Sequence, residues 1–337
     1  MNGRVRIVDI AQELGVSTAT VSNVIHGKTK KISDETVRRV QQLLEEREYI
    51  PSMAGILLAQ NSSRIIGVIL HNHAKYEGHV LEDPFIASAV NDLSCEIERA
   101  GYFMMLKTTT ECQDIIRFAS MWNVSGMVLI GFCEQDYKRL RDNMHIPFVV
   151  YDGFLEEPDR ICNLVIDNYD GGYQVGRHLA GLGHRRMLCV SDNDICMDRQ
   201  RYEGFQKAAM DAGSSADFFK IPLNREKRRE FYAEHFNRIL QYTAIFAVSD
   251  AYAVELMQFL MERGIRIPDD LSIAGFDDTP ICRQTVPTLT SVRQDRALRA
   301  KEAMVVLQRL GNGQEKGSVI TLPVTLQVRS STANCTK

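Results

Sequence analysis

The chain has 337 residues, with 40 lysines and arginines against 43 aspartates and glutamates, which gives a net charge of −3 at neutral pH. It has no long apolar segment, signal peptide or lipidation motif, so we expect a cytoplasmic protein with no membrane partner. Its eight cysteines are scattered without Cys-x-x-Cys spacing and mostly lie in apolar runs. This usage indicates reduced, buried thiols and argues against a disulfide framework.

The first pattern along the chain is a helix, a turn and a second helix. Apolar residues recur at helical spacing from Ile7 to Leu14 and again from Val16 to Ile25, and Gly15 supplies the backbone freedom that a tight turn requires. Ser17 stands at the expected N-cap of the second helix, whose outer face is small, polar and uncharged: Thr18, Ala19, Thr20, Ser22 and Asn23. Such a face is typical of a helix that reads DNA, and an ordinary helical hairpin with a solvated face is the alternative.

The segment from Gly15 to Gly27, GVSTATVSNVIHG, resembles the signature GVSxxTVSxVxxG of the lactose repressor (LacI/GalR) family of bacterial transcription regulators at every fixed position. The resemblance implies that the second helix contacts operator DNA through Ser17, Thr18, Ala19, Thr20, Ser22, Asn23 and His26. Asn23 departs from the family, which usually has an arginine there. Because asparagine pairs best with adenine and arginine favours guanine, we expect an operator altered at that base pair.

Basic charge gathers around this predicted reading helix. Residues 1–31 hold five basic side chains and two acidic ones, a local charge of +3 in a chain whose total is −3. Such a cluster suits phosphates, and a solvated surface is the alternative for any one lysine. A third helix is predicted to begin after Ser33, with Asp34 and Glu35 in its first turn, and to close a small three-helix domain over residues 1–50.

Residues 51–62 are predicted to form a hinge. The segment from Tyr49 to Ser63, YIPSMAGILLAQNSS, resembles the family's hinge pattern YxPNxxARxLA, which implies that Leu58 wedges into the minor groove of DNA. A plain linker with an exposed leucine is the alternative. Gly55 stands where the family has an alanine, and it should cost a hinge helix about 1 kcal/mol. We therefore expect this hinge to order on DNA less readily than is typical.

From residue 63 onward, apolar runs such as IIGVIL and AIFAVSD alternate with amphipathic helical stretches, as in parallel sheets covered on both faces. This length suits two doubly wound lobes with a ligand between them. The segments VIDNYDGG (165–172), RYEGF (201–205) and GFDD (275–278) resemble the family's periplasmic-binding-protein-like core. We therefore expect a small all-α helix-turn-helix domain followed by an α/β core of two parallel-sheet lobes. Lobe 1 should span about 63–164 and 294–322, and lobe 2 about 165–293 and 323–337.

The resemblance also implies an effector site between the lobes. Arg201 and Asp277 match the residues that commonly hold the effector in the family, and a guanidinium facing a carboxylate across a cleft can bind vicinal hydroxyls. We expect a sugar or glycoside, with a purine or another metabolite as the alternative. Phe85 resembles the family's cleft aromatic, and a core phenylalanine is the rival interpretation. Further candidates at strand ends are Asp152, Ser249 and Asp250, and for all the polar residues a helix cap or an interlobe salt bridge is the alternative.

The segment 71–82, HNHAKYEGHVLE, is longer than the family's usual turn and holds three histidines beside acidic residues. Its spacing fits no set of metal ligands, so we expect a flexible lip over the cleft, no metal and no cofactor.

The main rival function is a sugar-modifying enzyme with a DNA-binding appendage. The chain has no GxxxxGK[ST], GxGxxG, GxSxG or HExxH motif, so we expect no enzyme. We predict a transcriptional regulator of the repressor type, which binds double-stranded operator DNA as a homodimer under the control of a small effector. Five residues follow VRSST (328–332) and hold no heptad pattern for a tetramer, which favours a dimer.

Overall fold

The computed structural model describes residues 5–50, 63–155 and 160–336. They belong to two compact units, Met1–Ser63 and Arg64–Lys337. The predicted hinge, with Gly55 and Leu58, falls on residues 51–62 and so lies outside the described residues. Within the described ranges, no helix is long and apolar enough to cross a membrane.

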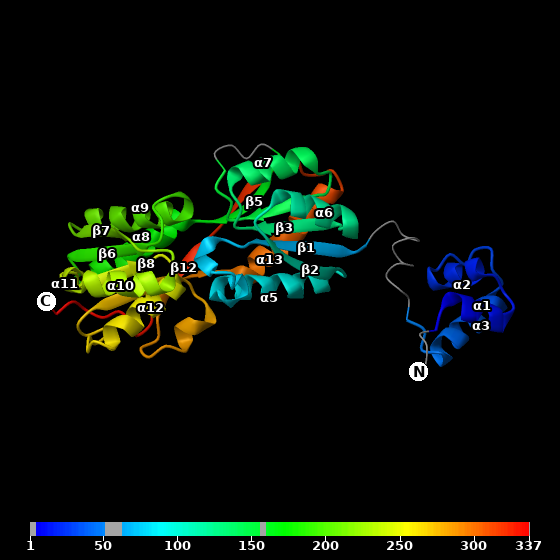
Figure 1. The fold of residues 1–337 in the computed structure, drawn as a ribbon, viewed down its shortest axis with the longest axis horizontal. Helices are drawn as coiled ribbons and strands as arrows, with labels where there is room; N and C mark the ends of the chain where they lie inside the picture. The colour runs from blue at the N-terminus through cyan, green and yellow to red at the C-terminus, as the bar shows by residue number, and fades with distance from the viewer. Residues whose placement is uncertain (1–4, 51–62, 156–159, 337) are drawn as a thin grey trace. The chain divides into compact units, whose positions relative to one another are not determined.

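Over its described residues, the first unit consists of three helices around a small core (Figure 1). They are α1 (Ile7–Leu14), α2 (Thr18–Ile25) and α3 (Asp34–Glu46). Gly15 ends α1 with a φ of 68°, a left-handed conformation that glycine adopts without steric cost. Ser17 and Ser33 cap the next two helices, because their hydroxyl oxygens accept hydrogen bonds from backbone amides three residues on. The buried residues of the core are Ile10, Ala11, Val21, Val24, Val40 and Leu43.

Lobe 1 of the second unit is a six-stranded parallel sheet in the order β11-β5-β4-β3-β1-β2. Its strands are β1 (Ile65–His71), β2 (Phe103–Thr109), β3 (Gly126–Ile130), β4 (Phe148–Tyr151), β5 (Cys162–Ile166) and β11 (Ser318–Leu322). Helices α5 (Pro84–Arg99) and α13 (Arg296–Gly311) cover one face, and α6 (Cys112–Trp122) and α7 (Glu134–Asn143) cover the other (Figure 1).

Strand β1 shows why these strands read as continuous apolar runs. Ile66, Val68 and Leu70 pack with α5 and α13, whereas Ile65 and Ile69 pack on the opposite face with α6. Because successive side chains of a strand point to opposite faces, a sheet covered on both sides requires apolar residues at every position.

Lobe 2 repeats this architecture in the order β12-β10-β9-β8-β6-β7, parallel except for the antiparallel pair of β10 and β12. Its strands are β6 (Arg186–Ser191), β7 (Ser215–Lys220), β8 (Ala244–Ala247), β9 (Ser272–Asp277), β10 (Thr290–Gln294) and β12 (Val324–Gln327). Helices α8 (Asn168–Gly181) and α9 (Cys196–Asp211) lie on one side of the sheet. On the other side lie α10 (Arg225–Glu234), α11 (Phe236–Ile239) and α12 (Asp250–Met261) (Figure 1).

The chain passes between the lobes after β5, after β10 and between β11 and β12. In each sheet the strand order reverses at one strand, because β1 pairs with both β2 and β3, and β6 pairs with both β7 and β8. Ligands of doubly wound sheets bind outside the carboxyl ends of strands at such reversal points. The two lobes therefore direct these ends toward one interlobe site.

All eight cysteines are free thiols. Cys112, Cys162, Cys189 and Cys282 are buried as expected, but Cys95 and Cys133 are exposed. The prediction of buried thiols is wrong for these two, because Cys95 lies on the solvent side of α5 and Cys133 lies at the N-cap of α7.

Candidate functional site

The predicted DNA-contacting residues lie on α2 of the first unit or at its two caps. Thr18, Ala19 and Asn23 are exposed, whereas Thr20, Ser22 and His26 are half-buried. Ser17 is exposed, but its Oγ accepts from the backbone amide of Thr20 at 3.1 Å and lies 2.9 Å from the Thr20 hydroxyl. Its structural role is therefore the cap of α2. The exposed lysines Lys28, Lys30 and Lys31 follow this helix.

In the second unit, two glycines hold α8 and α9 close together and thereby place Arg201. A Cβ at Gly172 would stand 1.9 Å from the carbonyl oxygen of Arg201, and a Cβ at Gly204 would stand 1.9 Å from the carbonyl oxygen of Tyr169. No side chain fits at these distances, so the glycines of the VIDNYDGG and RYEGF segments permit backbone contact between the helices. This contact fixes the part of α9 that carries Arg201.

Arg201 is buried and its guanidinium is held on several sides. Its Nε donates to Asn168 Oδ1 at 2.8 Å, its Nη1 donates to the carbonyl oxygen of Val248 at 2.6 Å, and the group lies 3.7 Å from the centre of the Phe276 ring. The Asp277 carboxylate ends β9, where its Oδ1 accepts from Gln294 Nε2 at 2.7 Å. Arg201 Nη1 and Asp277 Oδ1 are 3.9 Å apart, which is too long for a hydrogen bond.

Burial raises the pKa of Asp277 well above its ordinary value, and the charge of Arg201 offsets this only in part. The shift favours the protonated carboxyl, which can donate as well as accept a hydrogen bond. We expected Arg201 and Asp277 to face one another across the cleft. That expectation is wrong, because α9 and β9 both belong to lobe 2 and place the two side chains on the same wall.

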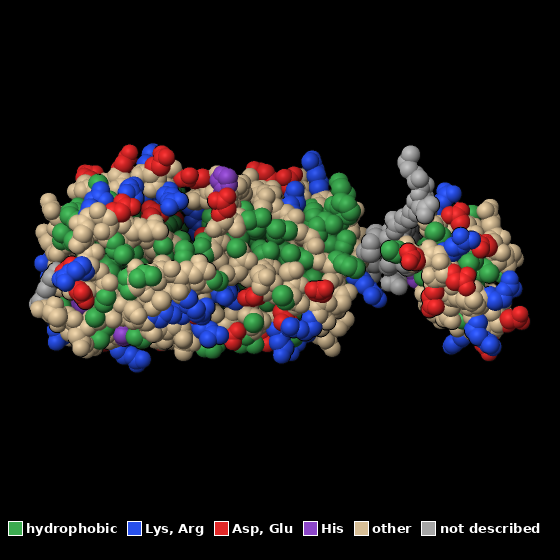
Figure 2. Space-filling model, turned by 90° about the horizontal axis from the view of Figure 1, so that it is seen from below, with side chains coloured by type: hydrophobic (Ala, Val, Ile, Leu, Met, Phe, Trp, Pro, Cys, Tyr) green, Lys and Arg blue, Asp and Glu red, His purple; other side chains and the backbone are tan. Residues whose placement is uncertain are grey.

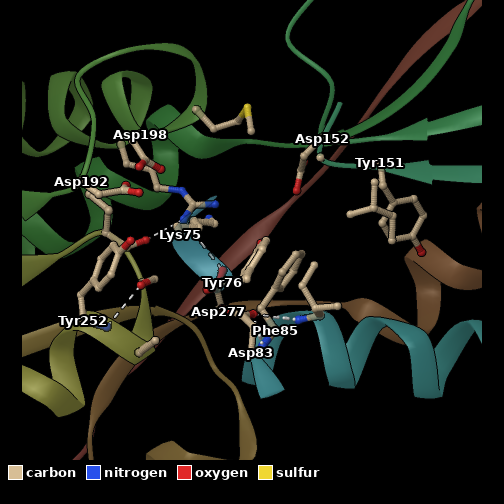
Figure 3. Close-up of a pocket in the computed structure, with 18 of the residues that line it drawn as sticks. Lys75, Tyr76, Asp83, Phe85, Tyr151, Asp152, Asp192, Asp198, Tyr252 and Asp277 are labelled. Carbon is tan, nitrogen blue, oxygen red and sulfur yellow. Dashed lines mark hydrogen bonds and ion pairs between the residues drawn. The ribbon is translucent and has the colours of Figure 1, made fainter. Parts of the chain in front are cut away.

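A cavity of about 230 Å³ lies between the lobes, and Figure 3 shows the residues that line it. Lobe 2 contributes Arg201, Ser249 and Asp277, and lobe 1 contributes Phe85 and Asp152. The structure therefore brings five of the six predicted effector residues to one cavity. Phe85 is half-buried near the start of α5, with its ring in the cavity wall (Figure 3).

Asp250 is the predicted residue that the structure does not bring into the cavity. Its carboxylate is fully enclosed behind the wall, where it accepts from the Thr279 amide at 2.8 Å, the Thr279 hydroxyl at 2.9 Å and the Ser291 hydroxyl at 2.6 Å. Burial raises the pKa of Asp250 to about 6. Asp250 thus ties the turn after β9 to β10, and in doing so positions Asp277. Its neighbour Ser249 lines the cavity and also caps α12.

Asp152 lines the cavity but is already paired with a buried cation. Its carboxylate oxygens lie 2.7 and 2.8 Å from the guanidinium nitrogens of Arg299, which is 1% exposed. Arg299 also donates to Gln294 Oε1 at 3.2 Å, and Gln294 in turn donates to Asp277. A continuous chain of polar contacts therefore joins the cavity residues Asp152 of lobe 1 and Asp277 of lobe 2.

Sequence reasoning missed several residues of the cavity. Asp192 follows β6, and Asp198 lies one turn before Arg201 on α9. Tyr252 is hydrogen-bonded to Asp192, and burial, together with the charge of Asp192, raises the pKa of its hydroxyl. Burial also raises the pKa of Asp198. Asp192 could have been predicted, because it ends the strand-like run MLCVSD. Asp198 could not, because its position in the sequence of α9 does not differ in kind from those of the exposed acidic residues on the same helix.

The segment 71–82 forms two short 3-10 helices, η1 (Ala74–Tyr76) and η2 (Val80–Glu82), and carries Lys75 and Tyr76 into the cavity wall. The prediction of a plain flexible lip is therefore too simple. Over the residues that the structure describes, no group of three histidine, cysteine or acidic side chains could hold a metal ion.

Two family models match the chain. The model of the bacterial regulatory proteins of the lacI family matches residues 6–52, and the model of the periplasmic binding protein-like domain matches residues 177–332. The amino-terminal part of the chain is therefore similar to the lacI family of bacterial regulatory proteins, and much of the second unit is similar to a periplasmic binding protein-like domain. This confirms the resemblance inferred from the GVSTATVSNVIHG segment.

Relatives of this chain are named as regulators of transcription. The chain is 29% identical over 338 residues to the "HTH-type transcriptional repressor PurR" of Mannheimia succiniciproducens, with 96% of this chain and 98% of the relative covered. It is also 29% identical over 342 residues to the "HTH-type transcriptional regulator DegA" of Bacillus subtilis, with 97% and 98% covered. These names agree with the transcriptional regulator that the sequence predicts.

Solved structures confirm the predicted fold class. The lac repressor dimer bound to operator and the anti-inducer ONPF has a TM-score of 0.84 at 22% identity, covering 98% of this chain and all of that one. The complex of the transcriptional regulator CelR with cellobiose has a TM-score of 0.70 at 23% identity, covering 97% and 100%. At these identities the likeness concerns the fold.

Proposed function

We propose that this protein represses transcription by binding operator DNA as a homodimer, and that a sugar or glycoside in the interlobe cavity controls its affinity for DNA. The observation that carries the effector assignment is the gap of 3.9 Å between Arg201 Nη1 and Asp277 Oδ1 on the cavity wall. A hydroxyl group can accept from the guanidinium and donate to the carboxylate, and neighbouring hydroxyls can do both at once. The proposed site of action is the cytoplasm, where bacterial DNA lies.

The cavity is suited to control because both lobes line it. A ligand that contacts Phe85 and Asp152 on lobe 1 and Arg201 on lobe 2 stabilises one relative orientation of the lobes. A ligand shifts such an equilibrium only by its difference in affinity for the two orientations, and couplings of this kind amount to about 1 to 3 kcal/mol.

A purine is the second candidate effector. Several relatives that cover nearly the whole chain are named PurR, and the Phe85 ring in the cavity wall offers a face on which a base can stack. The two candidates differ in what they require, since a base needs the aromatic face and a sugar needs the charged pair.

A thermal-shift screen of sugars, phosphosugars and purines tests the assignment. The effector should raise the melting temperature of the wild type but not of Arg201→Ala or Asp277→Ala. Arg199→Ala is the matched control, because Arg199 lies exposed on the same helix and is paired with Glu203 outside the cavity. Equal stabilisation of all variants would place the pocket elsewhere, and a purine hit lost with Phe85→Ala would favour the second candidate.

The dimer part of the proposal is supported by apolar surface on the core. Figure 2 shows hydrophobic side chains gathered in patches over the face of the core seen there. Phe103 at the start of β2 is 60% exposed, and Val286, beside a groove lined by Val254, Met257 and Met261, is 82% exposed. Patches of this kind mark interaction sites. Light scattering after size exclusion should give twice the chain mass, and Val286→Asp with Phe103→Asp should yield the monomer.

A further inference from the structure

The segment 72–82 spans the mouth of the cavity from one lobe to the other. It leaves lobe 1 after β1 and returns to lobe 1 at α5. Between these points Glu77 reaches lobe 2, where its Oε1 accepts from Asn224 Nδ2 at 2.6 Å and from the Arg225 amide at 3.3 Å, at the start of α10. This contact anchors the segment on the lobe opposite to its own.

Because the segment is anchored in this way, Lys75 lies at the end of the cavity that holds Asp192 and Asp198, which we call the acidic end. The side chain lies between Asp192 and Asp198 on lobe 2 and Tyr76 on its own lobe (Figure 3). Lys75 Nζ lies 5.0 Å from the centre of the Tyr76 ring. The Lys75 residue as a whole is exposed, although its side chain lines the cavity. Partial desolvation lowers the pKa of its ammonium, but the nearby carboxylates Asp192, Asp198 and Asp83 more than offset this, so the pKa is raised from its ordinary value. The ammonium therefore keeps its proton.

The other cations of the cavity are already committed. Arg201 donates to Asn168 and Val248, as described above, and Arg228 is bound by the Glu255 carboxylate at 2.9 to 3.2 Å and by two backbone carbonyls. The lining side chains hold five carboxylates, namely Asp83, Asp152, Asp192, Asp198 and Asp277, against the three cations Lys75, Arg201 and Arg228. Because the raised pKa of Asp277 favours its protonated form, four charged carboxylates remain against the three cations, and the formal charge of the cavity is −1 with Lys75 in place.

We propose that Lys75 is a tethered cation that occupies the acidic end of the effector cavity and thereby restricts the effector to an uncharged molecule. A cationic ligand is disfavoured because Lys75 already neutralises part of the acidic charge that would attract it. An anionic ligand such as a phosphate ester, which carries up to two negative charges, is repelled by the remaining excess of carboxylates. A neutral polyhydroxylated molecule can donate to Asp192 and Asp277 and accept from Lys75. This inference rests on the proposed effector site and narrows the class of its ligand.

The position of Lys75 is tested without any ligand by trace acetylation of the full chain followed by mass spectrometry. Only a deprotonated amine is acylated, so Lys75 should react about tenfold or more slowly than Lys301 on α13, which is also exposed but lies outside the cavity and its carboxylates. Asp192→Asn combined with Asp198→Asn should remove most of this difference. Equal rates for Lys75 and Lys301 in the wild type would overturn the inference.

The ligand class is tested by calorimetry with matched compounds: ribose and ribose 5-phosphate, and glucose, glucosamine and glucose 6-phosphate. The wild type should bind one of the neutral sugars about tenfold or more tightly than its phosphate ester. Lys75→Met should improve the affinity for glucosamine relative to glucose by about tenfold, because the acidic end then lacks a cation, and Lys301→Met should not.

Different results would contradict the role of Lys75 and the carbohydrate nature of the effector. Tighter binding of a phosphate ester than of its neutral sugar would contradict the role of Lys75 while supporting a carbohydrate effector. If no sugar binds the wild type, the carbohydrate assignment fails for these compounds, and the acetylation rates still decide whether Lys75 is the tethered cation.

Discussion

The reading face of α2 and the interlobe cavity are built in opposite ways. The face lies within ten residues of sequence, from Ser17 to His26, and its exposed members depend on one capped helix over a small core. The cavity collects side chains from Lys75 to Asp277 and holds them with buried charges and helix contacts too close for a Cβ. Substitutions in the face should therefore change DNA binding at little cost in stability, whereas substitutions around the cavity should cost stability first.

The largest effect is expected for Asp152→Asn. It leaves the buried guanidinium of Arg299 without its carboxylate, and breaking a buried ion pair from one side costs about 3 to 5 kcal/mol. Urea unfolding of the full chain measures the loss. Asp142→Asn is the control: Asp142 is exposed and paired with the half-buried Arg141, so the midpoint should change little. The double variant Asp152→Asn with Arg299→Leu should recover most of the stability.

Gly204→Ala tests the close contact between α8 and α9 in lobe 2. The added methyl group would meet the carbonyl oxygen of Tyr169 and force α8 and α9 apart, at a cost of roughly 1 to 3 kcal/mol and with weaker effector binding through Arg201. Gly181→Ala, at the end of α8, meets nothing within 4 Å and should stabilise the protein by about 0.4 to 1 kcal/mol. Calorimetric melting of both variants checks the signs, and a loss in both would show that helix spacing is not the cause.

Asn23→Arg should alter the operator and leave the fold intact. Asn23 is exposed on α2, so the change removes no core contact. Asparagine pairs best with adenine and arginine with guanine, so the free-energy preference between bases at one base pair should change by about 1 to 3 kcal/mol. Binding-site selection on both proteins measures the preference. Identical selected sites would show that residue 23 does not read a base.

The smallest effect is expected for Ser17→Ala, which deletes the cap of α2 and should cost about 1 kcal/mol. Faster hydrogen exchange at the amides of residues 18–25 in the full chain measures this loss. Ser17→Asp retains an acceptor for the Thr20 amide and should preserve the protection while weakening DNA binding, because its charge repels phosphates. If both variants exchange alike, the cap is not what orders the helix.

The sequence predicted the elements whose signals are local. The turn at Gly15, the caps at Ser17 and Ser33, and the alternation of buried strands and helices follow from spacing, and the fold class is confirmed. Five residues of the cavity followed from strand ends and the family resemblance, namely Phe85, Asp152, Arg201, Ser249 and Asp277. What could not be predicted is long-range. Asp152 pairs with Arg299, which is 147 positions away in the sequence, and the approach of Lys75 to Asp192 depends on how a segment of lobe 1 is anchored on lobe 2. Asp250 was misplaced for the same reason, since a strand-end position does not tell which side of the wall the carboxylate faces.

The most direct test of the account is operator affinity measured by fluorescence anisotropy, with and without a saturating ligand from the thermal-shift screen, on wild type and Arg201→Ala. The account predicts a change of about 5- to 150-fold in the wild type, and Arg201→Ala that binds DNA equally well but does not respond to the ligand. Ligand that saturates the cavity and leaves operator affinity unchanged would contradict it.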